Sequence, residues 1–198
     1  MIHIAKHFLP WHRPVINKAL RVLMLISALF MFAFGMFSPI YALFVKEIGG
    51  DITVAANAWA LFLLTAGVLT ILTGRLENHM RETELGIAWS QFLIAAAYFL
   101  YYFTSQVAMF YAAQFLLGVG TAFFWPAFHA VYGKHVDSSN AAQQWSFYDA
   151  LAYLVPSLAA VVGGWTVKAY GYQVIFMVMA ILSLVCGFFI LILPRKLL

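Results

Sequence analysis

The sequence predicts an all-α membrane protein with six transmembrane helices, and three observations lead to this prediction. Hydrophobic residues make up 65% of the 198 residues and charged residues only 9%, whereas about a quarter of the residues of a soluble domain are charged. The apolar positions run around every face of the expected helices instead of forming one stripe. Six apolar segments are each long enough to cross the bilayer, which takes about 20 helical residues.

The apolar segments divide the chain into spans with short connections that leave no room for another folded domain. We expect the spans at 21–45, 53–74, 85–104, 107–132, 141–167 and 172–193. The chain then consists of a basic amphipathic segment 1–20, a transmembrane domain 21–194 and a tail 195–198. The first span resembles a signal peptide in following basic residues, but its apolar run is longer and no small-residue cleavage pattern follows, so we expect it to be retained.

The basic residues orient the predicted bundle, because lysine and arginine resist translocation across the membrane. Nine of them fall on one side: Lys6, Arg13, Lys18, Arg21, Arg75, Arg81, Lys134, Arg195 and Lys196. Only Lys46 and Lys168 fall on the other side. We therefore expect both termini to be cytoplasmic in a cell inner or plasma membrane, with segment 1–20 at the lipid surface.

Several functional classes lack their sequence signatures. The single cysteine, Cys186, lies in the last apolar run and indicates neither a disulfide nor a thiol metal site. The sequence contains no Asn-Pro-Ala pair, nucleophile elbow, His-Glu-x-x-His zinc motif or P-loop. Its basic residues form no continuous face for nucleic acid. We expect no enzyme activity, no cofactor, no metal and no nucleic-acid partner.

Polar and aromatic side chains inside the spans are candidates for lining a substrate cavity. The candidates are Tyr41, Asn57, Gln114, Trp125 and Tyr153. Amides can hydrogen-bond a solute, and aromatic rings can stack on one or hold a cation. The alternative is that the amides join neighbouring helices and the rings serve packing and interfacial anchoring, which explains them at least as well. Three prolines within spans, Pro39, Pro126 and Pro156, are expected to shape or bend their helices.

His129 and Asp149 are expected at similar depth on the fourth and fifth spans, near the cytoplasmic boundary. If the two side chains meet, they are candidates for gating or for carrying a proton, since histidine titrates near neutral pH. The alternatives are a structural hydrogen-bonded pair or two separately solvated boundary groups, and boundary placement favours these readings.

The charged stretch Thr73–Glu82, TGRLENHMRE, is predicted to be a cytoplasmic turn between the second and third spans. Its Gly74, Leu76, Asn78, His79 and Arg81 occupy positions of a known pattern. The stretch resembles the Gly-x-Leu-x-Asp-Arg-x-Gly-Arg loop between the second and third helices of the major facilitator superfamily, with asparagine, histidine and arginine in place of aspartate, arginine and glycine.

Two further stretches are similar to the same family. QFLLGVGTA, which runs from Gln114 and contains Gly118 and Gly120, resembles the Arg-x-x-x-Gly-x-Gly-x-Ala pattern of the fourth helix, with glutamine replacing the arginine. PSLAAVVGGWTVKAYGYQVIF, which contains Gly163 and Gly164, is similar to the end of the fifth helix and the start of the sixth. Small residues at these positions allow helix backbones to approach closely, within one subunit or across an interface.

The resemblance covers one six-helix half, the N-terminal one, of a family whose usual members have twelve helices in two parallel halves. It implies a major-facilitator half-fold and a secondary transporter that moves a small solute, with a second copy of the chain supplying the other half. The implied mechanism is alternating access by rocking of the two halves. The alternatives are a non-transporting scaffold or regulatory subunit derived from a transporter, or one half of a heterodimeric transporter.

Overall fold

The computed structural model describes residues 16–77, 79 and 82–194, and long α-helices dominate these residues. In chain order the elements are α1 (Lys18–Phe37), η2 (Ser38–Ile40), α2 (Tyr41–Glu47), α3 (Ile52–Glu77), α4 (Thr83–Phe103), α5 (Val107–His135), α6 (Ala141–Tyr170) and α7 (Tyr172–Ile192). The predicted tail 195–198 and most of the predicted segment 1–20 lie outside the described residues.

Six helical stretches of the described chain are long and apolar enough to cross a membrane, which confirms the predicted number of spans. The first of them combines α1, η2 and α2, and the other five are α3 to α7. The observed helices extend past several predicted boundaries. The first half of the predicted turn at 73–82 is helical instead, because α3 continues through Glu77. Two of the turn positions, Asn78 and Arg81, lie outside the described residues.

Local sequence signals explain where the helices begin, break and end. The side chain of Asn17 caps α1 by accepting a hydrogen bond of 2.8 Å from the Leu20 amide. Pro39 cannot donate a backbone hydrogen bond, and α1 gives way to the short 3₁₀ turn η2 at this point. Gly171, with φ of 82°, takes a positive-φ conformation that glycine adopts readily, and it separates α6 from α7.

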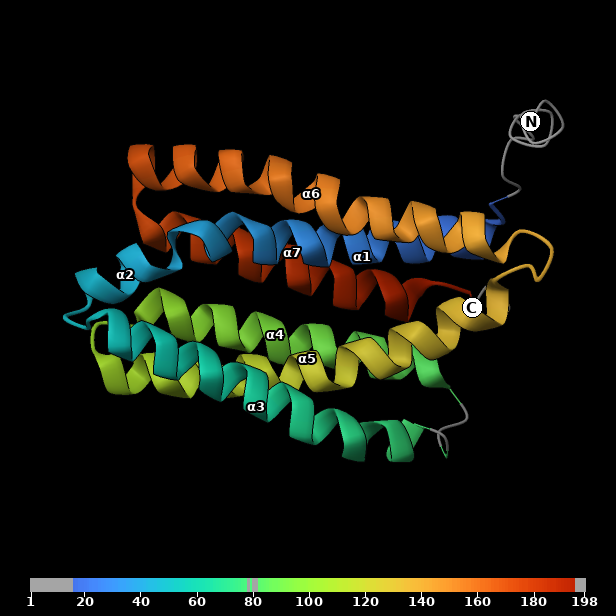
Figure 1. The fold of residues 1–198 in the computed structure, drawn as a ribbon, viewed down its shortest axis with the longest axis horizontal. Helices are drawn as coiled ribbons and strands as arrows, with labels where there is room; N and C mark the ends of the chain where they lie inside the picture. The colour runs from blue at the N-terminus through green and yellow to red at the C-terminus, as the bar shows by residue number, and fades with distance from the viewer. Residues whose placement is uncertain (1–15, 78, 80–81, 195–198) are drawn as a thin grey trace, which may run out of the picture.

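The spanning helices form two groups that are joined along one side (Figure 1). In the first group α1 packs against α6 and α7, and in the second α5 packs against α3 and α4. The α4–α7 contact connects the groups, whereas α1 and α5 touch only slightly. α1 begins and α7 ends at the same end of the bundle, called the terminal end below. The two groups are therefore closely packed through α4 and α7 and separated between α1 and α5.

Aromatic rings fill much of the space where helices meet. A cluster around Phe37 joins α1, α4 and α7, with the Phe37 and Phe176 ring centroids 5.0 Å apart and those of Tyr101 and Phe176 5.3 Å apart. A second cluster at the terminal end joins α5 to α6, with the Tyr132 and Trp145 centroids 4.7 Å apart. In lipid no hydrophobic effect drives helices together, so van der Waals contacts between packed rings of this kind hold them instead.

Pro126 lies within α5, which runs from Val107 to His135 without a break. A proline lacks the amide that would donate to the carbonyl four residues earlier, here that of Ala122. The hydroxyl of Thr73 on α3 donates to this carbonyl instead, at 2.7 Å. The proline predicted to bend the fourth span thus also creates a hydrogen bond between two helices.

Candidate functional site

The main hollow between the two helix groups lies where these groups separate. Its volume is about 320 Å³, and residues of α1, η2, α3, α5 and α6 line it. The lining residues are Phe30, Met31, Phe34, Gly35, Ser38, Phe62, Thr121, Trp125, Ala152 and Pro156. Thr121 lies midway along α5 and Pro156 midway along α6. If the helices span a bilayer, the hollow therefore lies near the middle of the membrane.

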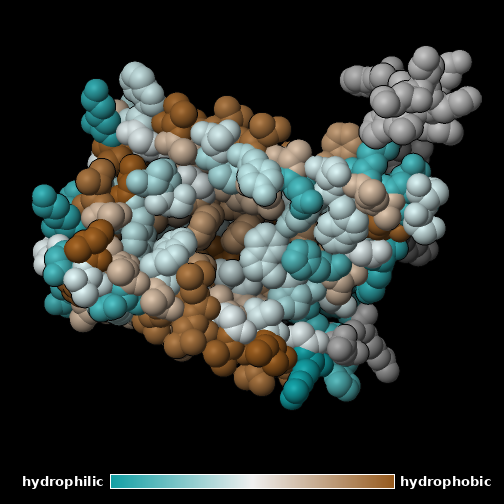
Figure 2. Space-filling model, viewed as in Figure 1, coloured by the Kyte–Doolittle hydropathy of each residue, from teal (hydrophilic) through white to brown (hydrophobic). Residues whose placement is uncertain are grey.

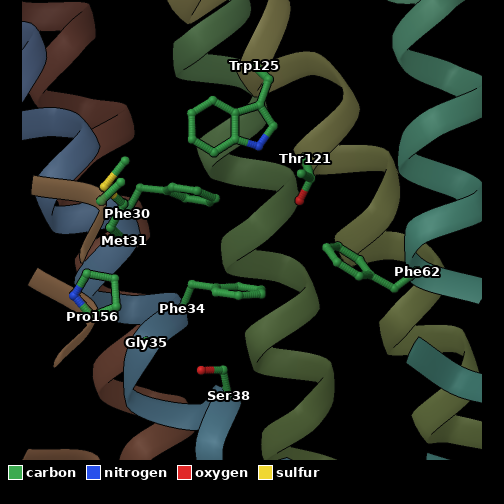
Figure 3. Close-up of a pocket in the computed structure, with 10 residues that line it drawn as sticks. Phe30, Met31, Phe34, Gly35, Ser38, Phe62, Thr121, Trp125 and Pro156 are labelled. Carbon is green, nitrogen blue, oxygen red and sulfur yellow. The ribbon is translucent and has the colours of Figure 1, made fainter. Parts of the chain in front are cut away.

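Aromatic rings make up the walls of the hollow (Figure 3). Phe30 of α1 stacks on Phe124 of α5 at a centroid distance of 4.4 Å and meets the edge of Trp125 at 5.7 Å. Phe34, one turn further along α1, lies 6.2 Å from Phe62 of α3. These rings bridge the gap between α1 and the α3–α5 side and form much of the wall of the hollow.

Close backbone contact between α1 and α6 shapes the remaining wall. A Cβ atom on Gly35 would lie 2.8 Å from the Pro156 Cα atom, so only glycine fits at this contact. Ser38 and Thr121 add hydroxyl groups to the lining. None of the lining side chains carries a charge.

The hollow opens on one broad face of the molecule (Figure 2). In the view of Figures 1 and 2 it lies near the centre of this face, with α6 along one edge and α3 along the other. We call this face, which α1, α3, α5 and α6 form around the hollow, the open face. α3 and α6 are the two spanning helices with the smallest buried share in the described bundle.

Of the five residues predicted for a cavity, Trp125 lines the hollow. Gln114 and Tyr41 lie together elsewhere, where the Gln114 amide nitrogen donates to the Tyr41 hydroxyl at 2.7 Å and that hydroxyl donates to the Ala55 carbonyl at 3.2 Å. Both side chains are buried. They line a separate space of only about 10 Å³ beside the main hollow, so their visible role is to join α2, α3 and α5.

The other two predicted cavity residues are exposed and line no part of the hollow. Asn57 lies near the start of α3. Tyr153 of α6, with 78% of its surface exposed, neighbours the lining residue Ala152. A contact of either side chain with a substrate stays a prediction.

His129 and Asp149 both lie one helical turn from the lining of the hollow, on the side of the terminal end. The His129 ring stacks on Trp125 at a centroid distance of 5.4 Å and meets the edge of Tyr148 at 6.4 Å. Asp149 is exposed. No hydrogen bond or ion pair joins His129 to Asp149 among the described residues, and their role in gating or coupling stays a prediction.

The predicted glycines take different positions in the packing. Gly118 contacts Thr65 and the Phe62 carbonyl of α3, and Gly120 contacts Ile94 of α4. Gly163 lies against the Met36 backbone of α1, with no room for a side chain. By contrast, a Cβ atom on Gly164 would meet nothing within 4 Å. Small residues on the fifth span therefore serve packing within the chain at Gly163 and leave an open position at Gly164.

The described residues of the charged loop motif make few contacts. A Cβ atom on Gly74 would meet nothing within 4 Å, and Leu76 is exposed. A ring nitrogen of the His79 side chain lies 2.9 Å from the Arg75 carbonyl. The buried group here is instead Glu77, which lies against Gly86 of α4 and whose two carboxylate oxygens have no hydrogen-bond partner among the residues that the structure describes.

The connection between α5 and α6 is held by a compact set of hydrogen bonds. The Asp137 carboxylate accepts two hydrogen bonds from Ser139. The backbone amide donates at 2.9 Å and the hydroxyl donates at 2.8 Å. These bonds hold the pKa of the exposed Asp137 carboxyl below its usual value. The Asp137 backbone amide in turn donates to the side-chain oxygen of Gln144. The backbone carbonyl of Gln144 accepts a hydrogen bond from the Tyr132 hydroxyl.

Several residues of the hollow were not singled out in the sequence. Phe30, Phe34 and Phe62 belong to a chain with 19 phenylalanines, so nothing distinguishes them by residue type alone. Ser38 does carry a signal, because a Ser-Pro pair inside an apolar span indicates a helix break with a polar group beside it. No group of three or more metal-ligating side chains occurs among the described residues.

Comparison with known proteins adds a sequence match and a structural match. Residues 23–197 match the sequence profile of the Major Facilitator Superfamily. The fold is similar to the in meso crystal structure of the POT family transporter PepTSo, with a TM-score of 0.70 and 16% sequence identity. The match covers 88% of this chain and 37% of that transporter chain. No curated protein sequence matches this chain.

Proposed function

We propose that this chain, which belongs to the major facilitator superfamily, is one six-helix half of a secondary transporter and works as a homodimer that moves a small solute by alternating access. Membership of a transporter family shows an integral membrane protein rather than an enzyme. The homodimer, the transport activity and the cytoplasmic orientation of the terminal end are our proposal.

The observation that carries the proposal is the open face with its hollow at mid-membrane depth. Acyl chains fill a concave aromatic surface poorly, and the exposed residues Asp149 and His129 each lie one helical turn from a lining residue of the hollow. Charged side chains within a spanning region usually face the bundle interior or a water-filled path rather than lipid. A second six-helix unit across this face would enclose the hollow between two halves, where family members of this type hold their substrates.

The arrangement of the face predicts how two copies would meet. α6 lies along one edge of the open face and α3 along the other (Figure 1). A twofold axis that runs parallel to the membrane normal, just outside the open face, exchanges the two edges. It therefore sets α6 of each copy against α3 of the other, in a self-complementary interface without inversion of either copy.

Exposed side chains on these two helices supply the contact surface. α3 exposes Leu63, Leu64, Val68, Ile71 and Leu72, and α6 exposes Leu158, Val161, Val162 and Trp165. On α6, Gly164 offers a position where a neighbouring backbone can approach closely. Membrane helices associate through such packing because lipid provides no hydrophobic drive.

Cysteine crosslinking in native membranes tests the proposed pairing. In a Cys186→Ser background, the double variant Leu64→Cys/Leu158→Cys places one thiol near the middle of α3 and one near the middle of α6. We expect oxidation to convert it to a covalent dimer on a denaturing gel, whereas each single variant stays monomeric. The matched control is Ala96→Cys/Ile181→Cys, which puts two exposed thiols on α4 and α7, away from the hollow, and should not give a dimer.

The outcomes separate the proposal from its alternatives. A dimer band in the control as strong as in the α3/α6 variant would mean random collision, and would contradict the proposed interface. Crosslinking of the α3/α6 variant only to a different chain would instead indicate a heterodimer or a regulatory subunit. Thiol labelling from each side of the membrane at an introduced Lys18→Cys checks the orientation, since we expect the terminal end to react from the cytoplasm.

A further inference from the structure

The chemistry of the hollow points to a substrate class, and this inference rests on the proposed function. We propose that the hollow binds a lipophilic ammonium ion, with its apolar part among the rings and its charged nitrogen toward the terminal end. Four features of the described residues support this assignment: the aromatic walls, unpartnered oxygens, the absence of nearby lysines and arginines, and a carboxylate beside the rim.

The aromatic walls suit an apolar or cationic molecule. Phe30, Phe34, Phe62 and Trp125 surround the space, and its volume of about 320 Å³ falls in the range of small-molecule sites. An ammonium group over the face of an aromatic ring is attracted by the ring quadrupole, most strongly with tryptophan. The lining therefore favours a small hydrophobic solute, with or without a positive charge.

The polar groups of the hollow include acceptors without an assigned donor. The hydroxyls of Ser38 and Thr121 form no hydrogen bond among the described residues, unlike several serines and threonines of the other helices, which bond a carbonyl of their own helix. These two hydroxyls are free to accept a hydrogen bond from a ligand N–H group.

Two lining residues also lose their normal backbone donor because of proline. Pro39 lacks the amide that would bond the Gly35 carbonyl, and Pro156 lacks the one that would bond the Ala152 carbonyl. For the third proline of the spans, Pro126, a threonine hydroxyl supplies the missing donor. No described side chain donates to the Gly35 or Ala152 carbonyl in place of the missing amides.

The distribution of charge selects a cation over an anion. No lysine or arginine that the structure describes lies in the middle of α1, α3, α5 or α6, because Lys18, Arg21, Arg75, Lys134 and Lys168 are all near helix ends. His129, which stacks on Trp125, is the basic side chain near the hollow in this part of the chain. An anion in the hollow would have no counter-charge, which makes its transfer out of water costly.

Asp149 supplies the matching negative charge. It precedes the lining residue Ala152 by three positions on α6, and residues three apart are neighbours on a helix surface. Among the described residues it takes part in no ion pair, so its charge is available to a ligand at the rim.

Direct binding to the purified full-length chain tests the assignment with two probes of similar size and opposite charge. The probes are 4-phenylbutylammonium and 5-phenylpentanoate, measured by calorimetric titration in detergent. We expect saturable binding of the ammonium and none of the carboxylate. A third probe, 4-phenylbutyltrimethylammonium, keeps the charge but has no N–H donor, and we expect it to bind several-fold more weakly because it cannot use the free oxygens.

Variants locate the binding site. We expect Trp125→Ala to weaken ammonium binding by about tenfold, which corresponds to the loss of one desolvated cation–π contact. We expect Asp149→Asn to weaken it by about threefold or more, because a charge at the rim is partly screened. The matched controls are Trp89→Ala, on the outer surface of α4, and Glu84→Gln, at the start of α4, and both should bind as the unaltered chain does. If Trp125→Ala does not fold, Trp125→Phe replaces it.

The possible results decide the substrate class and the proposed function separately. Equal binding of ammonium and carboxylate, equal weakening in the control variants, or no saturable binding of the ammonium would overturn the assignment of a cation. Uptake of radiolabelled 4-phenylbutylammonium into liposomes then tests transport. Saturable binding of the ammonium with no uptake would support the assigned ligand class and contradict the transport activity. Saturable uptake of a neutral or anionic solute that Asp149→Asn does not alter would support the transport activity and contradict the assigned ligand class.

Discussion

Two adjacent glycines of α6 allow a sharp test of the packing between α1 and α6. Gly163 lies against the α1 backbone, where an added Cβ atom would be 2.7 Å and 2.8 Å from the carbonyl carbon and the Cα atom of Met36. A Cβ atom added to Gly164, the next residue, would meet nothing within 4 Å. Replacing each by alanine adds the same methyl group to the same helix, so the difference between the two variants reports the contact with α1.

The expected magnitudes follow from these distances. Non-bonded carbon atoms prefer a separation of about 3.5–4.0 Å, so Gly163→Ala forces α1 and α6 apart by about 1 Å. Overpacking of this kind costs about 1–3 kcal/mol, while alanine in place of a helical glycine returns about 0.5–1 kcal/mol. We expect Gly163→Ala to lower the free energy of unfolding by about 1–2 kcal/mol and Gly164→Ala to raise it by about 0.5–1 kcal/mol.

Thermal unfolding of the monomeric fraction in detergent measures this difference without the proposed dimer contact at Gly164. A change of 1 kcal/mol moves Tm by about 2–4 °C in a chain of this length, so the two variants should melt about 5–10 °C apart, with Gly163→Ala lower. Equal Tm values would contradict the close backbone contact. A lower Tm for Gly164→Ala than for Gly163→Ala would mean that the rotation of α6 differs from that described here.

Three further changes test individual groups. Glu77→Met should raise the free energy of unfolding by about 1 kcal/mol, because it replaces a buried carboxylate that has no partner among the described residues; chemical denaturation measures the change, and a loss of stability would mean that the carboxylate has a stabilising partner. Thr73→Val should lower it by about 0.5–1.5 kcal/mol through loss of the α3–α5 hydrogen bond, whereas the control Thr166→Val, whose hydroxyl bonds only its own helix, should change little. Ser139→Ala should raise the pKa of Asp137 toward its usual value in a carboxyl NMR titration; because the folded pKa is depressed, the stability from this group is present above the usual pKa and lost as pH falls through the folded value.

The spans and their order could be predicted from the sequence because lipid imposes a simple rule of length and polarity. The connections are short, and the structure places helices within a few residues of each predicted span. For the charged stretch after the second span, this rule placed the end of the helix too early. Charge indicated a turn from Thr73 onward, but helix α3 extends to Glu77 and carries this side chain into contact with Gly86.

The hollow could be predicted only in part, because it depends on how the helices rotate and tilt. Trp125 stood out as a large polar-tipped ring beside a proline, and it does line the hollow. Gln114 stood out in the same way, yet it bonds Tyr41, a residue 73 positions away in the chain. Within a single sequence, a buried amide that contacts a solute and one that joins two helices have the same signal, so only the three-dimensional arrangement separates them.

The Asn17 side chain performs two tasks with one amide group. Its oxygen caps the first turn of α1, and its nitrogen donates at 2.8 Å to the His135 carbonyl at the last turn of α5. A motion that separates these two helix ends must break the bond from Asn17 to the His135 carbonyl. It then also frees the Asn17 amide group that caps α1. Widening of the bundle at the terminal end and fraying of α1 are therefore coupled, and hydrogen exchange at the Leu20 amide would report on both at once.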